Sequence, residues 1–81
     1  MDIKVVFGQV LRQARKEKQI SQERLALEAD VDRSYISKLE TGGYQPSLSM
    51  LFALAGVLEI KPSELVERVE EEFASIDVAD C

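Results

Sequence analysis

The sequence contains no histidine and only one cysteine, and these two shortages exclude many familiar active sites. Without histidine there is no imidazole to act as a general base or to bind a metal ion. Because Cys81 has no second cysteine to pair with, it can form neither an intramolecular disulfide nor a thiolate cluster. We therefore expect no metal and no other cofactor, and we expect the reducing environment of the cytoplasm.

Long apolar runs and glycine-rich loops are also missing. No segment approaches the roughly 20 apolar residues that span a bilayer, so no membrane association is expected. Asp2 and Lys4 interrupt the start of the sequence, which therefore lacks the pattern of a secretory signal. The pair Gly42-Gly43 lacks the lysine and hydroxyl residue of a phosphate-binding loop. The glutamates of residues 64–72 have no predicted pocket around them, so we predict that the chain is not an enzyme.

The remaining composition is typical of a small globular protein. Of the 81 residues, 46% are hydrophobic and 31% are charged, which argues against a disordered chain. The length fits one domain with a small core, a size at which association between copies often adds stability. We expect residues 1–74 to form this domain and residues 75–81 to be frayed.

Acidic residues are concentrated near the C-terminal end. The net charge is −5, yet residues 1–45 contain eight Lys or Arg and seven Asp or Glu. Residues 59–81 contain two basic and eight acidic residues, and residues 46–58 contain neither kind. The basic side chains of the first half can therefore face a phosphate backbone while the acidic end points elsewhere.

Hydrophobic periodicity and capping residues predict an all-α bundle of five short helices without strands. The predicted elements are a helix over 3–18, two short helices within 21–40 joined by a turn at Asp30, a helix over about 48–58 and a helix over about 62–74. Ser21, Asp32 and Ser47 occupy N-cap positions. Gly8 indicates either an irregular first turn or a close approach to a neighbour. Gly56 likewise indicates either a close approach to a neighbouring backbone or a glycine that the helix merely tolerates.

Residues 21–40 have the arrangement of a helix-turn-helix. Ile20 and Leu25 have the spacing of a hydrophobic staple, and Val31 and Ile36 repeat it at the next helix. The second helix then has an outward polar face. Such a helix fits the major groove of DNA, where an N-terminal arginine can bind guanine. We therefore predict base contacts from Arg33, Ser34, Tyr35, Ser37 and Lys38. An ordinary solvated helix face is the alternative interpretation.

Arg15 and Glu40 each lie one helical turn beyond an inward residue. Arg15 follows Leu11 by four positions, and Glu40 follows Ile36 by four. We expect a partly buried ion pair that joins the first helix to the third. Two independent surface charges, which would contribute little to stability, are the alternative.

The predicted helix over 48–58 is uncharged and apolar on nearly all sides. Such a helix needs cover from more than one direction. We expect one side to pack within the chain and the remainder, together with the apolar side of the last helix, to form a homodimer interface. The predicted interface residues are Met50, Leu51, Phe52, Leu54, Ala55, Val57, Leu58 and Val66.

Several motifs occur in the order typical of one family. They are Leu11-Arg12-x-x-Arg15, Ile20-Ser21-Gln22-x-x-Leu25-Ala26, Tyr35-Ile36-Ser37-x-Leu39-Glu40-x-Gly42, Pro46-Ser47-Leu48 and Leu58-x-Ile60-x-Pro62-x-x-Leu65. With these motifs, residues 7–65 resemble the Xre/Cro/C1-type helix-turn-helix regulators, which include the phage repressors. The resemblance implies a lambda-repressor-like DNA-binding domain. Within the family, residues 31–37 are similar to the recognition segment of the controller proteins of restriction–modification systems.

The resemblance implies a sequence-specific transcriptional regulator that binds double-stranded DNA at a palindromic operator as a homodimer, with autoregulation. It also implies that Arg15 and Glu40 form the family's structural ion pair. Phosphate contacts are implied for Arg12, Gln22, Tyr44, Gln45 and the backbone near Ser47. Asp30 and Glu59 depart from the family, because glycine is usual at both positions.

Other functions remain open at this stage. A phage-type repressor is one, and an antitoxin or adaptor that acts mainly by binding another protein is a second. The acidic face of the last predicted helix either contacts an RNA polymerase subunit or keeps the protein soluble. No small-molecule effector is expected for so small a chain.

Overall fold

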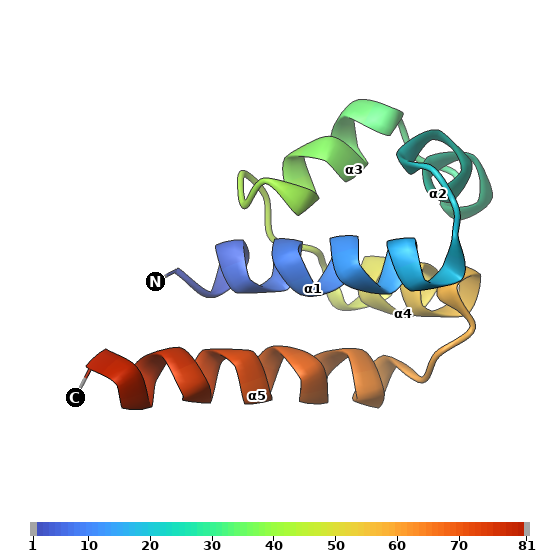
Figure 1. Cartoon of the computed structure of the whole chain (residues 1–81). Helices are drawn as coiled ribbons and strands as arrows, with labels where there is room; N and C mark the ends of the chain where they lie inside the picture. The colour runs from blue at the N-terminus through green and yellow to red at the C-terminus, as the bar shows by residue number, and fades with distance from the viewer. Residues whose placement is uncertain (1, 81) are drawn as a thin grey trace.

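The computed structural model describes the backbone of residues 2–80 and the side chains of residues 2–75. It contains five helices, α1 (Ile3–Lys18), α2 (Gln22–Ala29), α3 (Arg33–Glu40), α4 (Leu48–Leu58) and α5 (Pro62–Asp80) (Figure 1). Residues 2–80 contain no strand, so the predicted all-α fold with five helices is confirmed. None of the described helices is long and apolar enough to cross a membrane.

The last helix is longer than predicted. α5 continues to Asp80, so the predicted helix end at residue 74 is wrong. No glycine or proline follows Pro62, and nothing in the sequence therefore interrupts the backbone hydrogen bonding of this helix. Of the tail that we expected to be frayed, Cys81 lies outside the described residues.

Serine side chains cap the amino ends of α2 and α4, as predicted. Ser21 Oγ accepts a hydrogen bond from the backbone N–H of Arg24 at 3.0 Å. Ser47 Oγ accepts one from the backbone N–H of Met50 at 3.1 Å. Asp32 has the extended backbone of an N-cap residue, but its side chain makes no capping bond. The amino end of α3 therefore lacks a side-chain acceptor from its own cap.

Three helices end at a left-handed residue that is not glycine. The φ angles are 63° at Gln19, 61° at Asp30 and 58° at Glu59. This conformation costs roughly 1–2 kcal/mol for a residue with a side chain. The cost is offset because the following residue closes each helix with a backbone hydrogen bond and packs its apolar side chain against the core. These closing residues are Ile20, Val31 and Ile60. Asp30 and Glu59 thus adopt the backbone that glycine would supply.

α1 lies at the centre of the fold. It packs against α3 on one side and α5 on the other, while α2 and α4 pack against each other (Figure 1). Leu25, Ala26, Ile36 and Leu39 of the helix-turn-helix are buried with the inward residues of α1, whereas Ala29 and Val31 are half-buried. The buried core consists of Val6, Phe7, Val10, Leu11, Ala14, Leu25, Ala26, Ile36, Leu39, Leu54, Ala55, Leu58, Leu65 and Val69.

This core corrects part of the predicted dimer interface. Leu54, Ala55 and Leu58 are buried within the chain, so they are not available to a second copy. The reason is that α4 packs against both α2 and α5, which cover two of its sides. Its exposed side carries Leu48 and Phe52 instead.

Gly8 allows α1 to approach the end of α3. A Cβ atom on Gly8 would lie 2.5 Å from the carbonyl oxygen of Leu39 and 2.6 Å from that of Glu40. α1 is regular from Ile3 onward. Of the two possibilities left by the sequence, close approach is therefore the one that the structure shows.

The substitution Gly8→Ala is expected to lower the free energy of unfolding by about 1–3 kcal/mol, because backbone oxygens cannot rotate away from the added methyl group. The matched control is Gly56→Ala in α4, since nothing lies within 4 Å of a Cβ at Gly56. The control is expected to raise the free energy of unfolding by about 1 kcal/mol. Urea unfolding at one protein concentration, with the oligomeric state checked by sedimentation, measures both. Equal effects would contradict the close approach.

Candidate nucleic-acid interface

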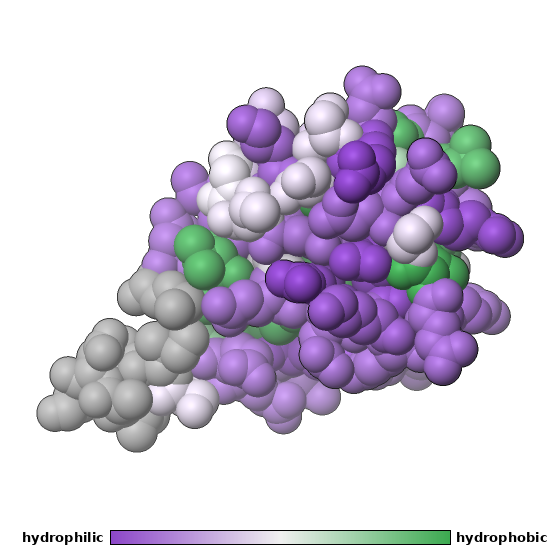
Figure 2. All heavy atoms as spheres, turned by 45° about the horizontal axis from the view of Figure 1, so that its top comes forward, coloured by the Kyte–Doolittle hydropathy of each residue, from purple (hydrophilic) through white to green (hydrophobic). Residues whose placement is uncertain are grey.

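α3 exposes the polar face that the sequence predicted. Arg33, Ser34 and Lys38 are exposed, and Tyr35 and Ser37 are half-buried. The remaining side of the helix is buried in the core. Figure 2, which brings the side of α2 and α3 forward, shows that this surface is predominantly hydrophilic. Arg33 has no hydrogen-bond or ion-pair partner among the side chains of residues 2–75, so its guanidinium group is available to a ligand.

Two tyrosines lie together beside this face. The ring centroids of Tyr35 and Tyr44 are 5.7 Å apart, and the ring planes are inclined by 32°. Lys38 Nζ lies 5.9 Å from the centroid of the Tyr44 ring, within the range of a cation–π interaction. Tyr44 comes from the segment between α3 and α4, so these contacts hold that segment against α3. A hollow beside them is lined by Val31, Asp32, Ser34, Tyr35, Lys38 and Tyr44.

Arg15 and Glu40 form an ion pair beneath α3. Arg15 Nε donates to Glu40 Oε2 at 2.6 Å, and Arg15 Nη2 donates to Glu40 Oε1 at 3.1 Å. The exposed fractions of the two side chains are only 12% and 3%. Arg15 Nη1 also donates to the carbonyl oxygen of Ile20 at 2.9 Å. This two-point geometry fixes α1 to the end of α3 and to the start of the helix-turn-helix.

Gln22 takes part in the same network, which the sequence did not reveal. Its Nε2 donates to Glu40 Oε1 at 3.0 Å. Gln22 is the first residue of α2 and is half-buried. It borders an open notch lined by Arg15, Ser21, Gln22, Glu23 and Arg33. The notch brings the amino ends of α2 and α3 to one place on the surface.

The other predicted phosphate contacts are also on the surface. Arg12 is exposed on α1, and Tyr44, Gln45 and Ser47 are exposed between α3 and the first turn of α4. Ser47 Oγ accepts the capping bond of α4, and its carbonyl oxygen accepts from Leu51 N–H, so a phosphate would bind to N–H or O–H donors at this position. Contact with phosphate stays a prediction for all of these residues.

A known family shares these features. The model of the helix-turn-helix family HTH_3 matches residues 11–65, which is more than half of the chain. The chain belongs to the Xre-type helix-turn-helix family. The family consists of DNA-binding transcriptional regulators rather than enzymes, and α2 and α3 form its helix-turn-helix.

Relatives within the family include controller proteins of restriction–modification systems. Control protein C.MunI from a Mycoplasma species is 43% identical over 72 residues, which cover 88% of this chain and 97% of that protein. The restriction-modification controller protein C.AhdI from Aeromonas hydrophila has a similar structure, with a TM-score of 0.74 and 45% identity over 76% of this chain and 94% of that chain. The immunity repressor of Bacillus phage phi105 is 44% identical over 62 residues. The chain spans only 43% of that repressor's length.

The helix-turn-helix domain also exposes an apolar face on α4 and α5, formed by Leu48, Leu51, Phe52 and Val66. Phe52 has an exposed fraction of 57%, and Leu51 is half-buried. Leu48, Leu51 and Val66 border one apolar hollow with Ile3. Of the predicted interface residues, Met50 and Val57 are also half-buried. Leu48 was not among the predicted interface residues.

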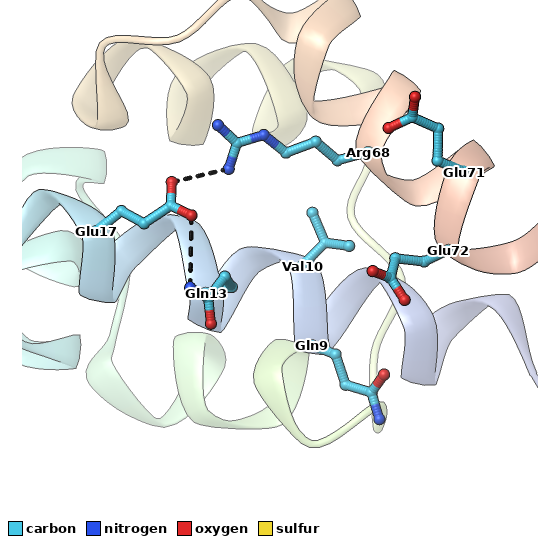
Figure 3. A pocket seen from close by; sticks show the side chains of 7 residues that line it. All are labelled: Gln9, Val10, Gln13, Glu17, Arg68, Glu71 and Glu72. Atoms are coloured by element: carbon cyan, nitrogen blue, oxygen red, sulfur yellow. Dashed lines mark hydrogen bonds and ion pairs between the residues drawn. The ribbon is translucent and has the colours of Figure 1, made fainter. Parts of the chain in front are cut away.

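A separate hollow of about 470 Å³ lies between α1 and α5 (Figure 3). Arg68 borders it and donates to Glu17 Oε1 at 3.1 Å and to Glu64 Oε2 at 3.0 Å. These bonds, first with Glu64 and then with Glu17, raise the pKa of Arg68 above its usual value. Glu71 and Glu72 line the same hollow. With its arginine already paired and several carboxylates around it, this side of the domain repels phosphate.

Proposed function

We propose that this chain is a controller-type regulator that binds a palindromic operator as a homodimer and regulates the genes of a restriction–modification system, including its own. The observation that carries the proposal is the exposed polar face of α3 in a chain that matches C.MunI over 97% of that protein. The match to C.AhdI over 94% of its chain supports the same conclusion. As a regulator of transcription, the protein would act in the cytoplasm.

In this proposal, α3 enters the major groove and its exposed side chains contact the bases. Arg33 lies at the amino end of α3, where an arginine can bind O6 and N7 of guanine together. Tyr35, Ser37 and Lys38 contact neighbouring bases or sugars. Phosphate contacts, which position the protein without selecting sequence, come from Arg12, Gln22, Tyr44, Gln45 and the backbone near Ser47.

The second copy joins through the apolar face of α4 and α5. Burying this face in a dimer removes apolar area from water, at about 25 cal/mol per Å². A twofold dimer places its recognition helices about 34–36 Å apart, one turn of DNA. The operator then has two related half-sites. The acidic surface between α1 and α5 faces away from the phosphates.

Selection of bound DNA from a random pool tests the proposal directly. We expect the purified protein to enrich two inverted half-sites at a constant spacing, with binding that weakens steeply as salt concentration rises. Enrichment of a single unpaired half-site would contradict dimeric recognition. Binding without any sequence preference would contradict the assignment as a sequence-specific regulator. The presence of restriction endonuclease and methyltransferase genes next to the coding gene separates a controller from a phage-type repressor.

The substitution Arg33→Ala is expected to weaken operator binding by about 1–3 kcal/mol and to relax base choice at one position of each half-site. Arg33→Lys is the matched variant, because lysine keeps the charge but cannot form the planar two-point contact. We expect Arg33→Lys to lose discrimination at the same position while retaining most binding to non-specific DNA. Affinities for the selected operator and for single-base variants measure both effects. Equal weakening on every sequence would mean that Arg33 contacts phosphate rather than a base.

A further inference from the structure

The buried ion pair extends to the proposed DNA surface through Gln22. Glu40 Oε1 accepts hydrogen bonds from both Arg15 Nη2 and Gln22 Nε2, at 3.1 Å and 3.0 Å. Glu40 is buried at the end of α3, whereas Gln22 borders the open notch that also contains Arg33. One carboxylate therefore joins three helices and contacts a side chain that lies at the surface.

The chemistry of this contact determines how the Gln22 amide is oriented. An ionised carboxylate only accepts hydrogen bonds, so the amide must turn its NH₂ group toward Glu40. Arg15, which only donates, bonds to both carboxylate oxygens of Glu40. One N–H of the Gln22 amide is used in this bond. The second N–H remains available at the notch.

We propose that Glu40 is a positioning residue for DNA binding, because it holds the Gln22 amide with its second N–H ready to donate to a backbone phosphate at the amino end of α2. This inference rests on the proposed function and deepens it. The amino end of a helix already favours an anion, since its first backbone N–H groups have no partner within the helix. Glu40 adds a side-chain donor of fixed orientation to that site. It touches no DNA itself.

Removing the charge of Glu40 should turn the Gln22 amide around. In Glu40→Gln, residue 40 can donate as well as accept, so it can bond to either the NH₂ group or the carbonyl oxygen of Gln22. Arg15 then attracts the Gln22 carbonyl oxygen, because its guanidinium has lost its anionic acceptor. In that orientation the Gln22 carbonyl oxygen accepts a hydrogen bond from Arg15. The Gln22 N–H is then no longer held in position to donate to a phosphate.

A double-mutant cycle on operator affinity tests the proposal. The four proteins are the unmodified chain, Glu40→Gln, Gln22→Ala and the double variant, each titrated with operator at a temperature where circular dichroism shows it to be folded. We expect each single change to weaken binding about tenfold, and the double change to weaken it no more than Gln22→Ala alone. If Glu40 only stabilises the fold, folded Glu40→Gln binds operator like the unmodified chain, which would overturn the inference. Independent effects that multiply to about 100-fold in the double variant would overturn it as well.

Nuclear magnetic resonance gives a second measurement that needs no DNA and no variant of Glu40. The side-chain NH₂ signal of Gln22, assigned by its absence in Gln22→Ala, is expected at a shifted position with slowed exchange with water. A signal at the position of a free amide would overturn the inference while leaving the proposed function intact. Failure of the unmodified protein to bind DNA in a salt-dependent way would instead overturn both.

Discussion

Replacement of Arg15 by alanine is expected to lower the free energy of unfolding by about 3–5 kcal/mol. Arg15 supplies two hydrogen bonds to Glu40, whose side chain is only 3% exposed. Without the arginine, a carboxylate is left buried beside α1 with no opposite charge. The carbonyl oxygen of Ile20 also loses its side-chain donor. The cost arises mainly from the uncompensated charge rather than from the net value of the ion pair.

This loss is large compared with the total stability of small domains, which is about 5–15 kcal/mol. The matched control is Arg12→Ala, since Arg12 lies one turn earlier on the same helix and is exposed. The control is expected to change the free energy of unfolding by less than about 0.5 kcal/mol. Urea unfolding followed by circular dichroism measures both variants. A loss below about 1 kcal/mol for Arg15→Ala would show that the pair behaves as a surface ion pair.

The substitution Phe52→Asp is expected to convert the proposed dimer into monomers and to weaken operator binding at least about 100-fold. An aspartate placed in a desolvated apolar interface has no partner for its charge, and losing a central aromatic contact alone costs about 2–4 kcal/mol. Phe52 is 57% exposed in the single chain. The folded monomer should therefore tolerate the change, so the effect reports on association. Each monomer would then bind a single half-site without its partner.

Two further variants define this test. Leu27→Asp is the matched control, because Leu27 is 75% exposed on α2 and is not part of the apolar face formed by Leu48, Leu51, Phe52 and Val66, so the dimer should persist. Leu54→Asp should instead unfold the chain, since Leu54 is buried in the core. Sedimentation velocity over a range of concentrations, with circular dichroism as a check on folding, distinguishes these outcomes. A stable dimer of Phe52→Asp would show that another face holds the two copies together.

Much of the helix-turn-helix was predictable because its determinants are local. The caps at Ser21 and Ser47 lie within a few residues of the N–H groups that they bind. The buried positions of α3, Ile36 and Leu39, follow from helical periodicity. The polar face of α3 is what remains once those positions are assigned. The ion pair of Arg15 with Glu40 was also predicted, because each residue lies one turn from an inward position, but its two-point geometry was not.

The sequence by itself determined the five helices except the end of α5, the serine caps of α2 and α4, and the division of α3 into a buried and a polar side. The tertiary structure decided which side of α4 is buried, because a helix that is apolar all round has no preferred direction until its neighbours cover it. It therefore placed Leu54 in the core and left Phe52 outside. It also decided that Gln22 bonds to Glu40, since residues that lie 18 positions apart meet only when α2 and α3 pack together. Local patterns specify helices, whereas the surfaces that helices share depend on how they pack.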